Sequence, residues 1–145
     1  MRVKIIGDIT AFDKDIQDSI IKLEEHSSRY DELHFQIALN YGARDEMVRG
    51  VRNMLEDCKV GKLNPEDVTE ECFSGYLDTA GIPDPDLMIR TSGEQRLSNF
   101  LLWQLAYTEF YFTPVAWPDF DKEELIRIIE KYNERDRRYG GVKEE

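Results

Sequence analysis

Two arginines and a serine follow the short apolar run at 87–89. They are Arg90, Arg96 and Ser98. Guanidinium groups grip phosphate oxygens in a bidentate fashion, and a hydroxyl adds a further hydrogen bond. The cluster is informative because the formal net charge of the chain is −11, so the overall field repels anions. This stretch therefore predicts a binding site for a diphosphate.

The same arginines also have a plainer interpretation. Arg90 and Arg96 could form ordinary surface ion pairs with Glu94 or Asp86, which are close in the sequence. The spacing of these residues alone leaves both interpretations open.

The predicted surroundings of the cluster favour an anion site. We expect a buried strand at 87–89 and a helix at 100–105, with Ser98 or Asn99 as the N-cap of that helix. In open α/β sheets, ligands bind beyond the carboxyl ends of strands. A helix N-terminus at that place offers free backbone N–H groups to an anion.

Strand and helix patterns alternate along the rest of the chain. Further strands are predicted at 3–6, 33–39 and 110–112, and further helices at 13–28, 43–59, 65–77 and 121–132. The order predicts an α/β fold, with a mainly parallel sheet of about four strands flanked by helices, in a single domain over 1–145. Because the chain opens on a strand, we expect another subunit to cover that sheet edge, or a part to be missing.

Composition excludes several classes of function. The net charge of −11 disfavours binding to nucleic acid or to an anionic membrane. No apolar run approaches the roughly 20 residues of a transmembrane helix. Cys58 and Cys72 have no metal-ligand spacing around them and suggest reduced thiols in a cytoplasmic protein.

Longer motifs resemble one family. The stretch from Asp86 to Gln104, followed by Tyr107 and Glu109, is similar to the long signature of cis-prenyltransferases of the undecaprenyl diphosphate synthase type. Other segments match in the same order: Ile6-Gly7-Asp8, Asn40-Tyr41-Gly42-Ala43-Arg44, Trp117-Pro118-Asp119-Phe120 and the ending 135–141. The resemblance implies an enzyme that joins isopentenyl diphosphate to an allylic diphosphate, forming a cis double bond. It also implies a cytoplasmic location, with peripheral membrane association through the lipid product.

The resemblance also implies roles for particular residues. Arg90, Arg96 and Ser98 would hold the diphosphate of isopentenyl diphosphate. Arg138 and Gly140 would join them, because the family's Arg-any-Gly motif reaches the active site across a dimer interface.

A metal site follows from the resemblance as well. Glu109 would sit by the diphosphate and its Mg²⁺, the implied cofactor. Magnesium favours a carboxylate together with phosphate oxygens. The implied partners are the two diphosphate substrates and a second copy of the chain.

The resemblance covers only the C-terminal part of the family. The family's His-any-Met-Asp-Gly-Asn-any-Arg-Trp loop, which binds the allylic diphosphate and metal, has no counterpart here, nor has its Phe-Ser-any-Glu-Asn-Trp segment. Asp8 follows a strand and a glycine, but its surroundings match a later strand, so we interpret it as structural. Asn40 and Arg44 flank a strand end, where they could face a ligand or could be purely structural.

We therefore expect a truncated cis-prenyltransferase that keeps the isopentenyl diphosphate half-site, and the missing loop leaves its activity alone uncertain. It would work as a homodimer or with a chain that supplies that loop. Two alternatives stay open. One is a non-catalytic subunit or relic that binds diphosphate or completes a partner's site, and the other is a diphosphate-binding domain with an unrelated role.

Overall fold

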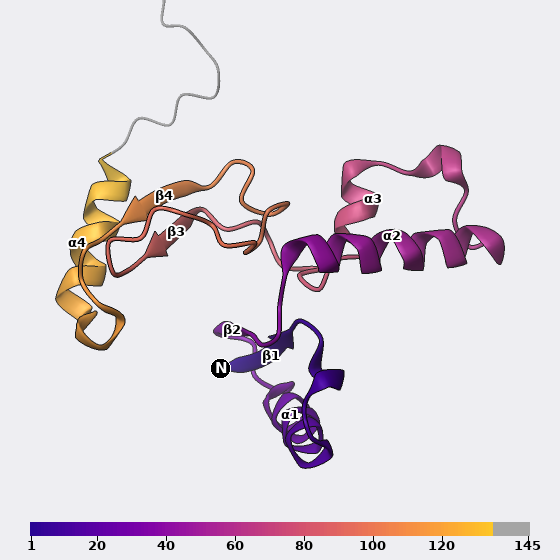
Figure 1. Ribbon diagram of the computed structural model, residues 1–145, viewed down its shortest axis with the longest axis horizontal. Helices are drawn as coiled ribbons and strands as arrows, with labels where there is room; N and C mark the ends of the chain where they lie inside the picture. Colours follow the sequence, from indigo (N-terminus) through magenta and orange to yellow (C-terminus); the bar gives the residue numbers. More distant parts are fainter. Residues whose placement is uncertain (135–145) are drawn as a thin grey trace, which may run out of the picture. The chain divides into compact units, whose positions relative to one another are not determined.

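The computed structural model describes residues 1–134 and divides the chain into two compact units (Figure 1). The first unit contains Met1–Pro83 and Ser98–Trp103. The second contains Asp84–Leu97 and the chain from Gln104 onward. Each unit is described by itself below. None of the helices in residues 1–134 has the length and apolar character needed to cross a membrane.

The first unit is built on a pair of parallel strands. Its elements are β1 (Arg2–Ile6), α1 (Lys14–Ser27), β2 (His34–Ala38), α2 (Ala43–Lys59) and the short α3 (Glu70–Ser74), with 3₁₀ turns at Ile9–Ala11 and Pro65–Asp67. β1 and β2 pair in register from Arg2 with His34 to Ile6 with Ala38. The buried apolar side chains of this unit come from β1, α1, α2 and the turn after α3. They are Val3, Ile6, Ile20, Ala43, Met54 and Leu77.

The edge of β1 that faces away from β2 is closed by helix α1. The backbone N–H of Val3 donates to Ser27 Oγ at 3.0 Å, and that of Ile5 donates to Glu24 Oε1 at 2.6 Å. Ser27 is buried. These side chains take the hydrogen bonds that a neighbouring strand would otherwise make. The sequence predicts that another subunit covers this edge or that a part is missing, and at these two positions helix α1 of the same chain covers it.

The second unit repeats the parallel arrangement on a smaller scale. β3 (Leu87–Arg90) pairs with β4 (Glu109–Phe112), and helix α4 (Lys122–Asn133) follows a 3₁₀ turn at Trp117–Asp119 (Figure 1). The N-cap of α4 is Asp121, whose side chain accepts the N–H of Glu124 at 2.9 Å, and an aspartate followed three residues later by a glutamate is the sequence pattern of a capping box.

The expected α/β class with parallel strands is confirmed, and all four predicted strands form. Within residues 1–134 they hydrogen-bond as two pairs, β1 with β2 and β3 with β4. The predicted helix at 43–59 matches α2, including both its ends.

Two predicted helices are wrong. The helix expected at 65–77 is interrupted at Val68, which is extended, and Thr69 starts α3 by accepting the N–H of Cys72 at 3.1 Å. The segment 100–105 forms turns, because Asn99 and Leu101 have φ angles of 61° and 45°. A left-handed backbone cannot continue a right-handed helix.

Candidate functional site

The loop that follows β3 carries the predicted anion-binding arginines and is tied to the chain beyond β4. Ser92 N–H donates to the carbonyl of Val115 at 2.8 Å, and Gly93 N–H donates to that of Thr113 at 2.9 Å. In the other direction, Thr113 N–H donates to the carbonyl of Arg90 at 2.9 Å. These three backbone hydrogen bonds fix the start of the loop at the carboxyl end of β3.

Arg90 is the last residue of β3, and Arg96 lies in the loop that follows. The guanidinium of Arg90 donates to the backbone carbonyl of Arg96, and the guanidinium of Arg96 forms an ion pair with Glu94. The pair to Glu94 is the plainer interpretation of the sequence, and it forms. Its side chains are 63% and 41% exposed, so the pair is screened by water and easily exchanged for a stronger anion.

Thr113 is the buried centre of this arrangement. It is 1% exposed, and its Oγ1 donates to Glu124 Oε1 at 2.7 Å. Arg127, together with Thr113, hydrogen-bonds to Glu124 and lowers the pKa of that carboxyl. The carboxylate of Glu124 thus ties α4 to Thr113, which is hydrogen-bonded to Arg90 and to Gly93 at the start of the site loop, a role that the sequence analysis did not assign. The sequence offers one signal for this role, namely that the polar residue Thr113 directly follows the aromatic strand β4.

Glu109 lies at the other end of the same small sheet. It pairs in register with Leu87, whereas Arg90 pairs with Phe112. Three residue steps separate the two positions, which is about 10 Å along a strand. Because side chains alternate between faces, Glu109 and Arg90 also point to opposite faces. Glu109 and Arg90 therefore start from opposite ends of this short strand pair.

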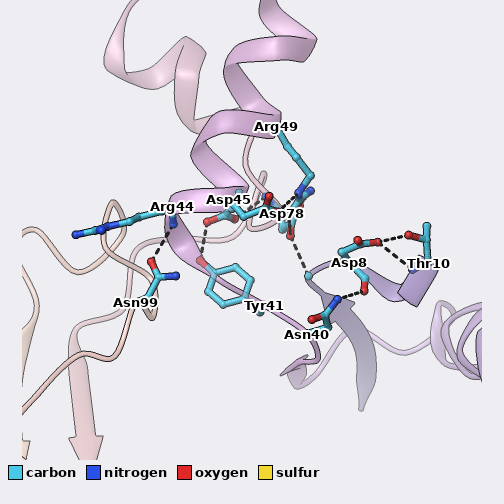
Figure 2. A network of polar contacts seen from close by, with 11 residues as sticks. Asp8, Thr10, Asn40, Tyr41, Arg44, Asp45, Arg49, Asp78 and Asn99 are labelled. Atoms are coloured by element: carbon cyan, nitrogen blue, oxygen red, sulfur yellow. Dashed lines mark hydrogen bonds and ion pairs between the residues drawn. The ribbon is translucent and has the colours of Figure 1, made fainter. Parts of the chain in front are cut away.

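Ser98 belongs to the first unit, where its neighbour Asn99 is fixed to the start of α2 (Figure 2). The carbonyl of Asn99 accepts the N–H of Ala43 at 2.8 Å, and its Oδ1 accepts the N–H of Arg44 at 3.0 Å. Ser98 and Asn99 both have left-handed backbones, with φ of 51° and 61°. A Cβ on Gly42 would lie 2.8 Å from Asn99 Nδ2, so a side chain at 42 would push the Asn99 amide aside. Asn99 thus caps α2, and the predicted cap of a helix at 100–105 is wrong.

Asp8 and Asn40 follow β1 and β2 at the carboxyl ends of the strands. Asn40 has a φ of 45°, and its Nδ2 donates to the carbonyl of Asp8 at 2.9 Å. The Asp8 carboxylate accepts both the N–H and the hydroxyl of Thr10, and these hydrogen bonds lower its pKa. This geometry agrees with a structural role for Asp8.

An ion pair lies next to this strand end (Figure 2). The Asp78 carboxylate accepts from Arg49 at 3.0 and 2.8 Å and from the N–H of Gly7 at 2.9 Å. Arg49 also donates to Asp45 at 2.9 Å. The guanidinium of Arg49 holds the pKa of the Asp78 carboxyl below its usual range. The pair joins α2 to the end of β1.

Glu46 completes the support of the strand ends. It is 1% exposed, and it accepts the hydroxyl of Tyr41 at 2.6 Å and the N–H of Asp78 at 2.8 Å. Burial, together with the hydrogen bond to Glu46, raises the pKa of the Tyr41 hydroxyl. Sequence reasoning missed Glu46, because its charge and its place in a helix are typical of a solvated residue.

Arg44 differs from Asn40 in what its side chain does. Asn40 is engaged in the turn that ends β2, whereas the guanidinium of Arg44 makes no hydrogen bond or ion pair with another residue of 1–134. Figure 2 shows it extending away from the network. Arg44 is therefore the better ligand candidate of the two.

Two further predictions concern the C-terminal residues Arg138 and Gly140 and the binding of a metal ion. Arg138 and Gly140 lie outside the described residues. Within residues 1–134, no group of three or more His, Cys, Asp or Glu side chains is arranged to hold a metal ion. The roles predicted for Arg138, Gly140 and Glu109 stay predictions.

Comparison with known proteins gives a consistent result. A family model described as "Putative undecaprenyl diphosphate synthase" matches residues 1–140. An isoprenyl transferase of Clostridium perfringens is 48% identical over 143 residues, which are 99% of this chain and 56% of that protein. One of Brucella suis is 51% identical over 142 residues, 98% of this chain and 56% of that protein. The chain thus spans little more than half the length of these relatives.

Solved structures show the same likeness. Lavandulyl diphosphate synthase from Lavandula x intermedia, in complex with dimethylallyl diphosphate, superposes with a TM-score of 0.91 and 40% identity, over 97% of this chain and 60% of that one. A probable undecaprenyl diphosphate synthase from Campylobacter jejuni gives a TM-score of 0.83 and 36% identity, over 97% and 63%.

Proposed function

Because this chain belongs to the undecaprenyl diphosphate synthase family, we propose that it carries the isopentenyl diphosphate half of a cis-prenyltransferase site. The enzyme would condense isopentenyl diphosphate with an allylic diphosphate. We propose further that residues 1–145 correspond to the C-terminal part of such an enzyme. One solved relative was obtained with dimethylallyl diphosphate, which is an allylic diphosphate.

The observation that carries the proposal is the contact between Arg90 and Arg96 at the carboxyl end of β3, where the Arg90 guanidinium donates to the Arg96 carbonyl. Arg96 is held by an exposed carboxylate, that of Glu94. A diphosphate has more negative charge and more acceptor oxygens than a carboxylate, so it would displace Glu94 and engage both guanidinium groups. Ser98 would add a hydroxyl.

The residues present fit the magnesium chemistry of such a site. Glu109 supplies one half-buried carboxylate, and Mg²⁺ takes its remaining ligands from phosphate oxygens and water. When bound, the ion would neutralise charge on the leaving diphosphate. We propose that Glu109 lies by the bound diphosphate and its Mg²⁺. A homodimer is what Arg138 and Gly140 would require.

Titration with isopentenyl diphosphate in the presence of Mg²⁺ tests the half-site. Arg96→Ala should weaken binding by about tenfold or more, because it removes a charge-assisted contact. Glu94→Gln should tighten binding, because it removes the carboxylate that competes for Arg96. Arg52→Ala is the control, since Arg52 is exposed on α2 and lies in the other unit. If Arg96→Ala binds as tightly as wild type, the loop is only an ion-paired surface and the proposal is wrong.

A second candidate is a non-catalytic subunit that would receive the family's Asp-containing loop from another chain. A chain that bears that loop should then restore prenyl transfer when mixed with this one. Robust turnover of both diphosphates by this chain without any addition would rule out the non-catalytic role.

A further inference from the structure

A small pocket lies on one face of the β1–β2 pair. Its volume is about 210 Å³, and it is lined by Arg2, Lys4, His34 and Gln36, together with the loop 80–82. All these residues belong to the first unit.

Sheet geometry explains why four polar side chains meet there. Arg2 pairs in register with His34, and Lys4 pairs with Gln36. Register partners share a face, and so do residues two apart along a strand. The four side chains therefore form a two-by-two array at the start of the strands, away from the end that carries Asp8.

The array gathers positive charge in an acidic chain. Arg2 and Lys4 lie two residues apart on the same face, so two cations stand close together there. Two of the groups are partly compensated: Lys4 Nζ donates to the Asp78 carbonyl at 2.6 Å, and His34 Nε2 lies 3.1 Å from Asp31 Oδ1. The guanidinium of Arg2 makes no hydrogen bond or ion pair with another residue of 1–134.

We propose that this pocket binds a small phosphate-class anion, orthophosphate or diphosphate. Arg2 and Lys4 supply charged donors, and the Gln36 amide supplies neutral ones. An anion with several acceptor oxygens matches this donor set and offsets the positive charge of Arg2 and Lys4. The site is separate from the Arg90 loop and does not depend on the function proposed above.

The test is a backbone-amide NMR titration of the whole chain with sodium phosphate and, separately, sodium diphosphate, at constant ionic strength. Saturable shifts are expected at Lys4, Gln36 and the loop 80–82. Arg2→Gln should weaken binding, so that the dissociation constant measured from these amides rises by about tenfold. Arg52→Gln makes the same charge change on an exposed surface outside the pocket and should leave it unaltered.

Because shifts are followed residue by residue, binding at Arg90 and Arg96 is distinguished from binding here. Shifts confined to that loop, or an equal loss in Arg2→Gln and Arg52→Gln, would overturn the proposal. Arg2 is exposed and without a side-chain partner among residues 1–134, so Arg2→Gln should fold normally. An unchanged thermal unfolding midpoint would verify that its effect is on binding.

Discussion

The side chain of Asn99 caps helix α2 at Arg44, a residue 55 positions earlier in the chain. This hydrogen bond, at 3.0 Å, and the parallel one from Ala43 to the Asn99 carbonyl fix a backbone that is left-handed at both Ser98 and Asn99. The start of α2 thus determines where Ser98 is placed.

Asn99→Ala should therefore lower both stability and ligand binding. Loss of a helix cap costs about 1 kcal/mol, with a range of roughly 0.5–2. Isopentenyl diphosphate should bind more weakly, because Ser98 is no longer held in its left-handed conformation. Urea unfolding and calorimetric titration measure the two effects.

Asn99→Asp provides the control, since it keeps the oxygen that caps α2. Its stability should match wild type, because a negative charge is favourable at a helix N-terminus. Its affinity for isopentenyl diphosphate should still fall through charge repulsion. A loss of stability as large as that of Asn99→Ala would argue against the cap.

Asp78→Asn should destabilise the first unit by about 1–3 kcal/mol near neutral pH. The change removes the charge that pairs with Arg49 and weakens acceptance from Gly7. Asp78 has a folded-state pKa below its ordinary value of 3.8, so its contribution is fully present above that value and disappears as the pH falls through the folded pKa. Urea unfolding of wild type and variant, from about pH 7 to about pH 3, should show the difference shrinking on acidification. A difference that stays constant with pH would contradict the ion pair as its source.

Tyr41→Phe should cost about 1–3 kcal/mol, because Glu46 is buried and loses a hydrogen-bond donor. The folded-state pKa of Tyr41 is raised above its ordinary value of 10.0, so this stabilisation is present below that pH and is lost as the pH rises through the folded pKa. In alkaline absorbance titration, the variant should lack the tyrosine that ionises last. Loss of a normally ionising tyrosine instead would show that the hydrogen bond to Glu46 is absent in solution.

Thr113→Val should loosen the arginine loop with almost no change in side-chain shape. It removes the hydroxyl that donates to Glu124, at an expected cost of about 1–2 kcal/mol, and isopentenyl diphosphate should bind more weakly. Thr108→Val is a matched control: Thr108 is also buried and donates to the Pro85 carbonyl at 2.7 Å. The control should lose comparable stability and keep its affinity. Equal effects on affinity would mean that Thr113 has no special link to the loop.

Much of the local structure could be read from the sequence. The four strands, helix α2 and the cap of α4 at Asp121 follow from side-chain periodicity and from capping residues a few positions away. The Arg90–Arg96 cluster was visible for the same reason, because its members are neighbours in the chain. Glu94 was identified as a competing partner from proximity alone, and that ion pair forms.

Tertiary structure decided the features whose partners are far apart in the sequence. Only folding shows that Asn99 caps α2, that Ser27 and Glu24 close the edge of β1, and that Thr113 meets Glu124. Sequence patterns report hydrogen bonds within a turn or a strand, whereas these depend on which elements pack together. The sequence by itself determined which chemistry is present in the Arg90 loop, and the register of β3 with β4 determined that Glu109 lies opposite Leu87, three residue steps from the pair of Arg90 with Phe112.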